Sequence, residues 1–221
     1  MNIALIGATG RTGRLLLDVL LQRDHHVTAL AREPGKLGTA ANSPAVRVVR
    51  GDVRDHDALR QLVAGNDVII SALGPTTKEA DLHTRTAEAL TEVMRTDGIR
   101  RFVGISGAGV DAPGDRKSRR DRTISWLINR LGGAVVKDKP AELAVWRRSG
   151  LDWTLVRPPR LLDTPPTGRV EHHANESTSQ TSISRADLAA FIADVAEQGL
   201  YRQAAPFVAN SGRPRRRRGI G

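Results

Sequence analysis

Residues 7 to 13 read GATGRTG and follow directly on the apolar run NIALI at residues 2 to 6. They open a stretch from about Arg11 to Arg23 whose apolar residues recur at helical spacing. A glycine-rich turn between a strand and a helix is the place where many α/β proteins bind phosphate groups. This stretch therefore predicts an α/β fold, with a strand, a phosphate-binding turn and a helix at its N-terminus.

Each glycine of the turn has an expected task. Gly7 permits a sharp exit from the strand, Gly10 lets the backbone approach a pyrophosphate, and Gly13 lets the helix pack closely on the strand. The alternative is a tight turn that needs glycine only for positive φ. We expect the following residues to surround the phosphates: Gly7, Thr9, Gly10, Arg11, Thr12 and Gly13.

Short β-branched runs and helical stretches alternate through the first half of the chain. Further strands are expected at 27–31, 45–49, 67–73 and 101–106, and further helices near Asp55 and over 82–97. This order is typical of a Rossmann-type doubly wound parallel sheet. We therefore predict that fold class, with a small C-terminal region on the substrate side.

The second half is less regular. Helices are expected over about 120–130, from about Pro140 with Asp138 as its N-cap, and over 185–197, and a strand over 152–156 stopped by Pro158. Residues 164–182 are polar and predict a loop, and Arg185 and Asp187 are expected to form a structural pair. We predict one domain over 1–212, with substrate-side elements mainly in 110–185, and a basic, disordered tail over 213–221.

Composition excludes several classes of function. The 221 residues include no cysteine, so disulfides, thiolate metal sites and cysteine nucleophiles are impossible. The net charge is +10, but five arginines lie in the last nine residues, and without them it is +5. We therefore expect no specific nucleic-acid partner. His172 and His173 are expected at the surface, and we predict no metal site.

No apolar run is long enough to cross a bilayer, so we expect no membrane association and a cytoplasmic location. The expected state is a monomer or a homodimer. The expected partner is a small-molecule substrate.

Arg32 stands at the end of the second expected strand, nineteen residues after Gly13. A carboxylate at this place pairs with the ribose hydroxyl of NAD, whereas a guanidinium accommodates the 2′-phosphate of NADP. The carboxylate of the next residue, Glu33, leaves NAD as the alternative cofactor. We predict NADP(H) in preference to NAD(H), with Arg32 on the 2′-phosphate and Arg11 as a second cation.

Several motifs in a fixed order resemble the atypical short-chain dehydrogenase/reductase superfamily. They are GATGRTG, GDVRD at 51–55, SALG at 71–74, ISGAG at 105–109, KPAEL at 139–143, SGLDWTLVRPPRL at 149–161 and ISRADLA at 183–189. The chain is most similar to the NAD(P)H-binding group of NmrA-like proteins and flavin or biliverdin reductases. The resemblance extends to about residue 198.

The resemblance implies further cofactor contacts. Asp52 and Val53 would border the adenine, and the segment SALG would line the path to the nicotinamide ribose. Both segments end parallel strands, where ligands of open α/β sheets bind. The SALG residues concerned are Ser71, Ala72, Leu73 and Gly74.

The catalytic pattern of the superfamily is incomplete in this chain. Ser106 matches its serine and Lys139 its lysine, which also binds the nicotinamide ribose, and Arg157 and Pro158 are expected at the nicotinamide end. The tyrosine four residues before the lysine is replaced by Val135. The single tyrosine, Tyr201, cannot be assigned that role from the sequence.

These features predict an NADPH-dependent oxidoreductase acting on a small planar, conjugated acceptor such as a flavin, quinone, bilin or polyketide-like molecule. Such an acceptor forms a stabilised anion, so hydride transfer can proceed without a positioned acid worth about 10²- to 10⁴-fold in rate. A non-catalytic NADP(H) sensor of NmrA type is the first alternative. A biosynthetic tailoring enzyme that uses the same pocket is the second.

Overall fold

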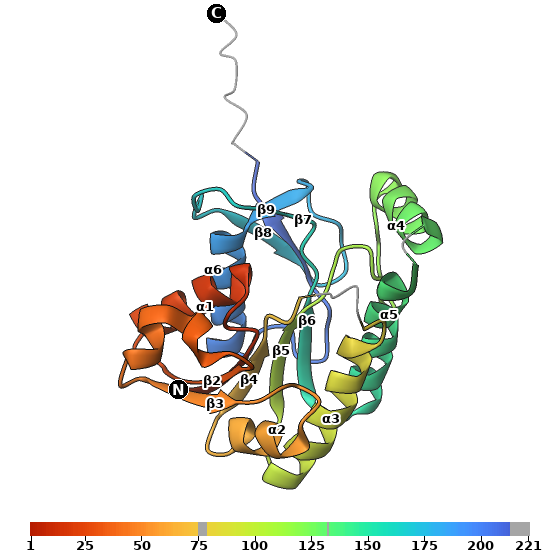
Figure 1. Ribbon diagram of the computed structural model, residues 1–221. Helices are drawn as coiled ribbons and strands as arrows, with labels where there is room; N and C mark the ends of the chain where they lie inside the picture. Colours follow the sequence, from red (N-terminus) through yellow and green to blue (C-terminus); the bar gives the residue numbers. More distant parts are fainter. Residues whose placement is uncertain (75–78, 132, 213–221) are drawn as a thin grey trace, which may run out of the picture.

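Six parallel strands form the central sheet in the computed structural model, which describes residues 1–74, 79–131 and 133–212 (Figure 1). The strand order is β3-β2-β1-β4-β5-β6, so the direction of winding reverses between β1 and β4. The predicted doubly wound sheet is therefore confirmed. Its strands are β1 (Asn2–Ile6), β2 (His26–Ala31), β3 (Val46–Arg50), β4 (Val68–Ser71), β5 (Arg101–Ile105) and β6 (Asp152–Val156).

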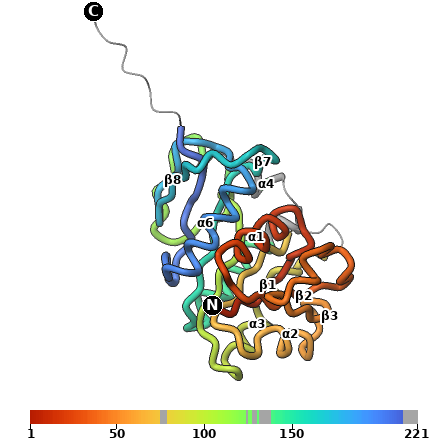
Figure 2. Tube along the Cα trace, turned by 90° about the vertical axis from the view of Figure 1, so that its left-hand side faces the viewer, coloured from red at the N-terminus to blue at the C-terminus, as the bar shows by residue number. Residues whose placement is uncertain are grey.

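Helices cover both faces of the sheet. Helices α1 (Arg11–Gln22) and α6 (Arg185–Glu197) lie side by side on one face, as Figures 1 and 2 both show. The other face carries α2 (His56–Val63), α3 (Leu82–Asp97) and α5 (Gly133–Arg148). The 3-10 helix η1 (Pro34–Asn42) joins β2 to β3, and α4 (Arg119–Leu131) precedes α5.

Alternation of side chains along β1 explains the two layers. Ile3 and Leu5 belong to the buried cluster that contains the apolar side of α1 and α6. Ala4 and Ile6 belong to the cluster under α2, α3 and α5. Because neighbouring residues of a strand point to opposite faces, an apolar run such as NIALI supplies both cores at once.

Two small sheets follow β6. Strand β7 (Arg160–Leu162) pairs with β9 (Ser182–Ser184), and β8 (Val170–His173) pairs with β10 (Phe207–Asn210). The prediction of a loop over 164–182 is therefore wrong for residues 170–173. The run VEHH carries no apolar alternation, and it becomes a strand because the distant β10 supplies its hydrogen-bond partners.

The start of α5 also differs from the prediction. This helix begins at Gly133 and runs through Pro140, so Pro140 is an interior residue and not the first one. Asp138 does not cap its own helix, because its carboxylate accepts the backbone N–H groups of His83 and Thr84 in the first turn of α3. A tertiary contact with α3 thus overrides the local proline signal.

The remaining expected elements agree with the structure to within a few residues at their ends. The predicted tail over 213–221 lies outside the described residues, so it stays a prediction. No helix within the described ranges has the length and apolar character needed to span a membrane.

The close approach of α1 to β1 gives a testable expectation about stability. A Cβ atom added at Gly13 would lie 1.9 Å from the Gly7 carbonyl oxygen. Gly13→Ala should therefore lower the free energy of unfolding by about 3 kcal/mol or more, at the upper end of overpacking costs. Urea denaturation measures this change.

Gly35→Ala is the matched control, because a Cβ at Gly35 meets no atom within 4 Å. It should change the free energy of unfolding by less than about 1 kcal/mol. Equal unfolding midpoints for the two variants would show that the helix does not depend on Gly13.

Candidate functional site

The glycine turn gives each of its three glycines a different environment. Gly7 has φ +81°, and a Cβ there would lie 2.7 Å from the Ala72 carbonyl oxygen. Gly13 is blocked by the Gly7 carbonyl, as described above. Gly10 has φ −79°, and among the described residues, its chain neighbours and own helix backbone aside, its added Cβ would meet the Gly7 carbonyl oxygen at 3.3 Å and no other atom within 4 Å. The fold thus demands Gly7 and Gly13, whereas Gly10 leaves an open approach to the backbone.

The N-terminus of α1 is built to receive a negative charge. Its N-cap is Gly10, which has no side chain to accept a backbone N–H, and its first turn has no acidic residue. Asp55 and Ser184, by contrast, cap α2 and α6 with side-chain oxygens. The first N–H groups of a helix have no intrahelical acceptor, and together with the helix dipole they favour an anion.

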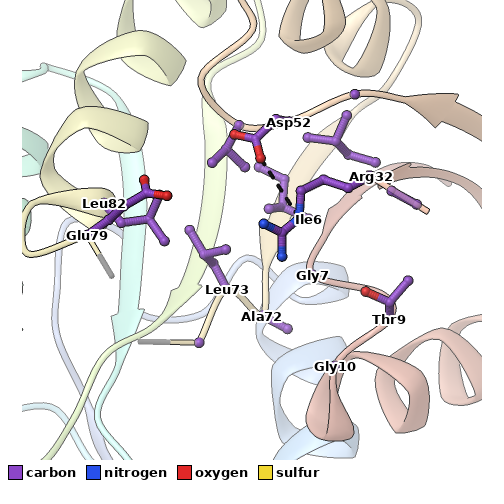
Figure 3. Close-up of a pocket in the computed structure, with 15 residues that line it drawn as sticks. Ile6, Gly7, Thr9, Gly10, Arg32, Asp52, Ala72, Leu73, Glu79 and Leu82 are labelled. Carbon is purple, nitrogen blue, oxygen red and sulfur yellow. Dashed lines mark ion pairs between the residues drawn. The ribbon is translucent and has the colours of Figure 1, made fainter. Parts of the chain in front are cut away.

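A cavity of about 290 Å³ lies beside this helix end, at the carboxyl edge of β1, β2, β3 and β4 (Figure 3). This edge includes the point where the strand order reverses, the usual ligand position in doubly wound sheets. The predicted cofactor residues among its lining are Gly7, Thr9, Gly10, Arg32, Asp52, Val53, Ala72, Leu73 and Gly74. Ile6, Leu30, Ala31, Gly51, Glu79 and Leu82 complete it.

Charged groups gather on the β2–β3 side of the cavity. The Arg32 side chain is 76% exposed, and its Nε lies 3.8 Å from Asp52 Oδ2, the contact drawn in Figure 3. Asp52 has a stronger partner in Arg54, whose Nε donates to Oδ1 at 2.7 Å. The hydrogen bond from Arg54 holds the pKa of the Asp52 carboxyl below its usual value, against the opposing effect of partial burial. Asp52 is therefore ionised and largely neutralised by Arg54.

Arg54 is a site residue that the sequence reasoning missed. Besides Asp52, it reaches Glu79 Oε1 at 3.3 Å and so links two carboxylates of the cavity wall. Its position two residues after Asp52 in GDVRD could have indicated this role. Glu33, the neighbour that left NAD open, has a partner in Lys36, whose Nζ donates to Oε1 at 2.6 Å and lowers the pKa of the carboxyl.

Four of the predicted cofactor residues on this half of the site do not line the cavity. The exposed Arg11 side chain donates to Asp163 at 3.1 Å, and the Thr12 hydroxyl accepts from Arg185 at 3.0 Å. Gly13 is taken up by packing, and Ser71 is a buried residue of β4. Arg185 and Asp187 both lie in the first turn of α6 and have separate partners, since Arg185 reaches Asp163 while the Asp187 carboxylate accepts from residues 167–168 and from Ser184.

Ser106 directly follows β5, and Lys139 contacts the last residue of that strand. Lys139 Nζ donates to the Ile105 carbonyl, which belongs to the peptide bond that leads to Ser106, and to Glu142 Oε2, both at 2.9 Å. The Ser106 hydroxyl is buried and has no hydrogen-bond partner within the described ranges. The structure therefore places Lys139 against the peptide bond that precedes Ser106, although neither residue lines the 290 Å³ cavity.

A buried pair of side chains, His83 and Asp138, contacts the segment that follows β4. His83 and Asp138 are 4% and 5% exposed, and His83 Nδ1 lies 2.8 Å from Asp138 Oδ2. His83 Nε2 lies 3.2 Å from the Leu73 carbonyl oxygen, so both ring nitrogens face oxygen atoms that can accept a hydrogen bond. Burial opposes ionisation of Asp138, but hydrogen bonds from Thr84 and His83 lower the pKa of its carboxyl. The sequence reasoning missed His83, which no local pattern marks.

Arg157 and Pro158, just after β6, form hydrogen bonds with the loop that follows β5. Arg157 was expected at the nicotinamide end, but its side chain is fully buried and donates twice to Asp115, at 2.6 and 2.7 Å. It also stacks on Phe207, with 3.8 Å from Cζ to the ring centroid. Pro158 accepts the Ala108 N–H at 3.0 Å, so this segment shapes the loop, and the predicted contact of Pro158 with the cofactor stays a prediction.

The histidines and the tyrosine lie on the face that carries α6. His172 and His173 are exposed, as predicted, and His172 Nδ1 lies 2.5 Å from the Tyr201 hydroxyl. Both rings pack near Phe191 of α6. Burial raises the pKa of the Tyr201 hydroxyl, and Lys139 belongs to α5 on the opposite face. Tyr201 and Lys139 therefore lie on opposite faces of the sheet.

Two relatives match most of the chain. An oxidoreductase of Emericella nidulans is 28% identical over 89% of this chain and 77% of its own length. An uncharacterised chloroplastic protein of Arabidopsis thaliana is 29% identical over 93% of this chain and 74% of its own length.

Solved structures share the fold. A short-chain dehydrogenase/reductase of Veillonella parvula, in complex with NADP, superposes with a TM-score of 0.79 at 21% identity, covering 96% of this chain and 95% of its own. ChuY, an anaerobillin reductase of Escherichia coli O157:H7, gives 0.78 at 22% identity, covering 96% and 98%.

The match to a protein family is more extensive than any local motif. Residues 7–199 match the family described as NAD(P)H-binding, from the first glycine of the turn to the residues that follow α6. The glycine turn, the uncapped helix and the cavity at the point of strand reversal all lie within that range. The chain belongs to the NAD(P)H-binding family.

Proposed function

We propose that the protein is an NADPH-dependent reductase of small planar, conjugated acceptors. The observation that carries the proposal is the pairing of an uncapped α1 N-terminus with Arg32 across one cavity. The first suits a pyrophosphate, and the second suits a phosphate on the adenosine ribose. NADPH has both groups.

The charges around the cavity support NADPH over NADH. Asp52 would repel a 2′-phosphate if it were unpaired, but Arg54 already neutralises it. Within the described part of the chain, Arg32 makes one ionic contact, a long one of 3.8 Å with Asp52, so its guanidinium is available to a phosphate. Glu33, which could hold a ribose hydroxyl, is bound to Lys36.

The chemistry of the second half of the site limits the acceptor. The bound dinucleotide would supply a hydride, and the Ser106 hydroxyl would orient the acceptor as a hydrogen-bond donor. Lys139 stabilises negative charge at the end of β5, but its amine is already bound to Glu142 and Ile105. With Val135 at the position of the usual tyrosine, solvent can complete protonation, and Lys137, Asp138, Ser106 or a loop histidine is the alternative proton source. A conjugated acceptor, whose reduced anion is stabilised by resonance, suits protonation by solvent.

The comparisons supply two further supports. The Veillonella parvula protein of the same fold is described in complex with NADP. ChuY, of the same fold, is described as an anaerobillin reductase, and a bilin is a conjugated acceptor. The Emericella nidulans relative is described as an oxidoreductase.

A non-catalytic NADP(H) sensor is the second candidate, and one observation favours it. Lys139 is held by two partners and is 16% exposed, an arrangement that a purely structural lysine would share. Under this hypothesis the protein binds NADPH tightly and reduces no acceptor.

Turnover separates the two candidates. We expect the protein to oxidise NADPH stoichiometrically with at least one member of a panel of flavins, quinones and bilins, followed as loss of absorbance of the reduced nicotinamide. Ser106→Ala should lower kcat by about tenfold or more, since one positioned hydrogen bond is lost. Tight NADPH binding without oxidation by any acceptor would reject the reductase and favour the sensor.

Cofactor preference depends on Arg32. Arg32→Ala should weaken NADPH binding by roughly 1.5 to 3 kcal/mol, or about 10- to 150-fold in Kd, because a charge-assisted phosphate contact is lost. NADH binding should stay almost unchanged. Titration of both nucleotides into wild type and variant measures the difference.

Arg100→Ala is the control for Arg32, because Arg100 is an exposed arginine that precedes β5 at the opposite edge of the sheet. It should alter neither affinity. Equal losses of NADPH and NADH affinity in Arg32→Ala would show that Arg32 does not read the 2′-phosphate.

Gly10 tests the phosphate turn without disturbing the fold. Gly10→Ala keeps an allowed φ and should change the free energy of unfolding by no more than about 1 kcal/mol. Its methyl group would occupy the approach to the backbone, so NADPH and NADH should both bind at least about tenfold more weakly. Calorimetric titration together with urea denaturation gives both quantities, and unaltered affinities would place the pyrophosphate elsewhere.

A further inference from the structure

Helices α1 and α6 run in the same direction on one face of the sheet (Figures 1 and 2). At their first turns Arg185 of α6 contacts Thr12 of α1. At their other ends Arg23 contacts Asp194 and Glu197. Both helices therefore begin at the carboxyl edge of the sheet, where the glycine turn lies.

A chain of polar contacts links the two starting turns. Arg185 Nη1 donates to Thr12 Oγ1 at 3.0 Å, and its Nε donates to Asp163 Oδ1 at 2.7 Å. The other carboxylate oxygen of Asp163 accepts from Arg11 Nη1 at 3.1 Å. The Arg185 side chain is 12% exposed, whereas those of Arg11 and Asp163 are 74% and 60% exposed. Arg185, which contacts Thr12 of α1, is thus the most buried of these three side chains.

The contact with Arg185 determines what the Thr12 hydroxyl can do. A guanidinium has donors and no acceptor, so Thr12 Oγ1 must accept, and its own proton remains for another partner. Among the described residues, no hydrogen bond donated by this hydroxyl is found. Thr86, Thr96 and Thr123 behave differently, because each donates its hydroxyl to the carbonyl four residues earlier in its helix.

We propose that Arg185 is a positioning residue for the dinucleotide pyrophosphate. It holds the Thr12 hydroxyl as a donor toward a phosphate oxygen and brings a second, largely buried positive charge to the start of α1. Asp163 keeps Arg185 in this orientation through the bond to Nε. The inference rests on the proposed function and concerns the part of the cofactor that NADPH and NADH share.

The competing explanation is that Arg185 merely clamps α6 to α1. Arg23 provides the matched control, because it joins the same two helices at their other ends through two carboxylates. A clamp predicts that Arg185→Gln and Arg23→Gln behave alike. A positioning role predicts that dinucleotide affinity changes in Arg185→Gln alone.

The experiment measures Kd for NADPH and NADH, together with the urea unfolding midpoint, in wild type and variants of the full chain. Arg185→Gln should weaken both nucleotides equally, by about fivefold to twentyfold, the effect of one lost hydrogen bond and a nearby charge. Thr12→Val should weaken both to a similar extent, and Thr12→Ser should restore binding. In the double variant Arg185→Gln/Thr12→Val, the fold-increase in Kd should be smaller than the product of the increases in the two single variants, because Arg185 and Thr12 act through one contact.

Arg23→Gln should shift the unfolding midpoint and leave both Kd values unchanged. Unchanged Kd values in Arg185→Gln, or equal losses in Arg185→Gln and Arg23→Gln, would overturn the positioning role while wild-type binding upholds the proposed function. Thr12→Val covers the case in which Arg185→Gln fails to fold, since it removes the hydroxyl and retains Arg185. A wild-type chain that binds neither nucleotide would overturn the proposed function and this inference together.

Discussion

The close contact between Gly13 and the Gly7 carbonyl is the constraint on which the site depends. An added Cβ at Gly13 would come within 1.9 Å of that oxygen, so the first turn of α1 lies directly against the end of β1. This approach brings the uncapped helix end to the carboxyl edge of the sheet, beside the ends of β2, β3 and β4. A helix displaced outward by one side chain would separate its N–H groups from the rest of the cavity.

Charged residues around this edge divide into two groups. Arg157 and Lys117 are buried and hold the loop after β5, Arg157 through Asp115 and Lys117 through the carbonyls of Ala108 and Val110. Both cations are therefore bound to groups of the protein itself. Arg32 is exposed and makes one long contact. Burial therefore separates Arg157 and Lys117, which hold the loop, from the exposed Arg32, a distinction that residue type alone does not make.

On the other face of the sheet, side chains of α3 and α5 contact the ends of β4 and β5. His83 joins Asp138 of α5 to the Leu73 carbonyl after β4, and Lys139, the next residue, reaches the Ile105 carbonyl after β5. Two adjacent residues of α5 are thus connected to the ends of two neighbouring strands, Asp138 through His83 and Lys139 directly. Breaking a buried pair of this kind leaves an uncompensated charge, so these contacts are costly to disturb. They connect the segment after β4, which lines the cavity, to the region of Ser106.

By itself, the sequence determined the order of strands and helices, the position of the glycine turn and the residues at the strand ends, because these follow from local periodicity and from glycine geometry. Arg32, Asp52 and Leu73 could be placed at one cavity, since parallel strands bring their carboxyl ends to the same edge. Only the tertiary structure decided which side chains are partners: Asp138 caps α3 instead of its own helix, Arg157 is buried, and Arg185 reaches Thr12. These contacts join residues 42 to 173 positions apart. Pairing over such separations depends on how helices pack across the sheet, which no local pattern encodes.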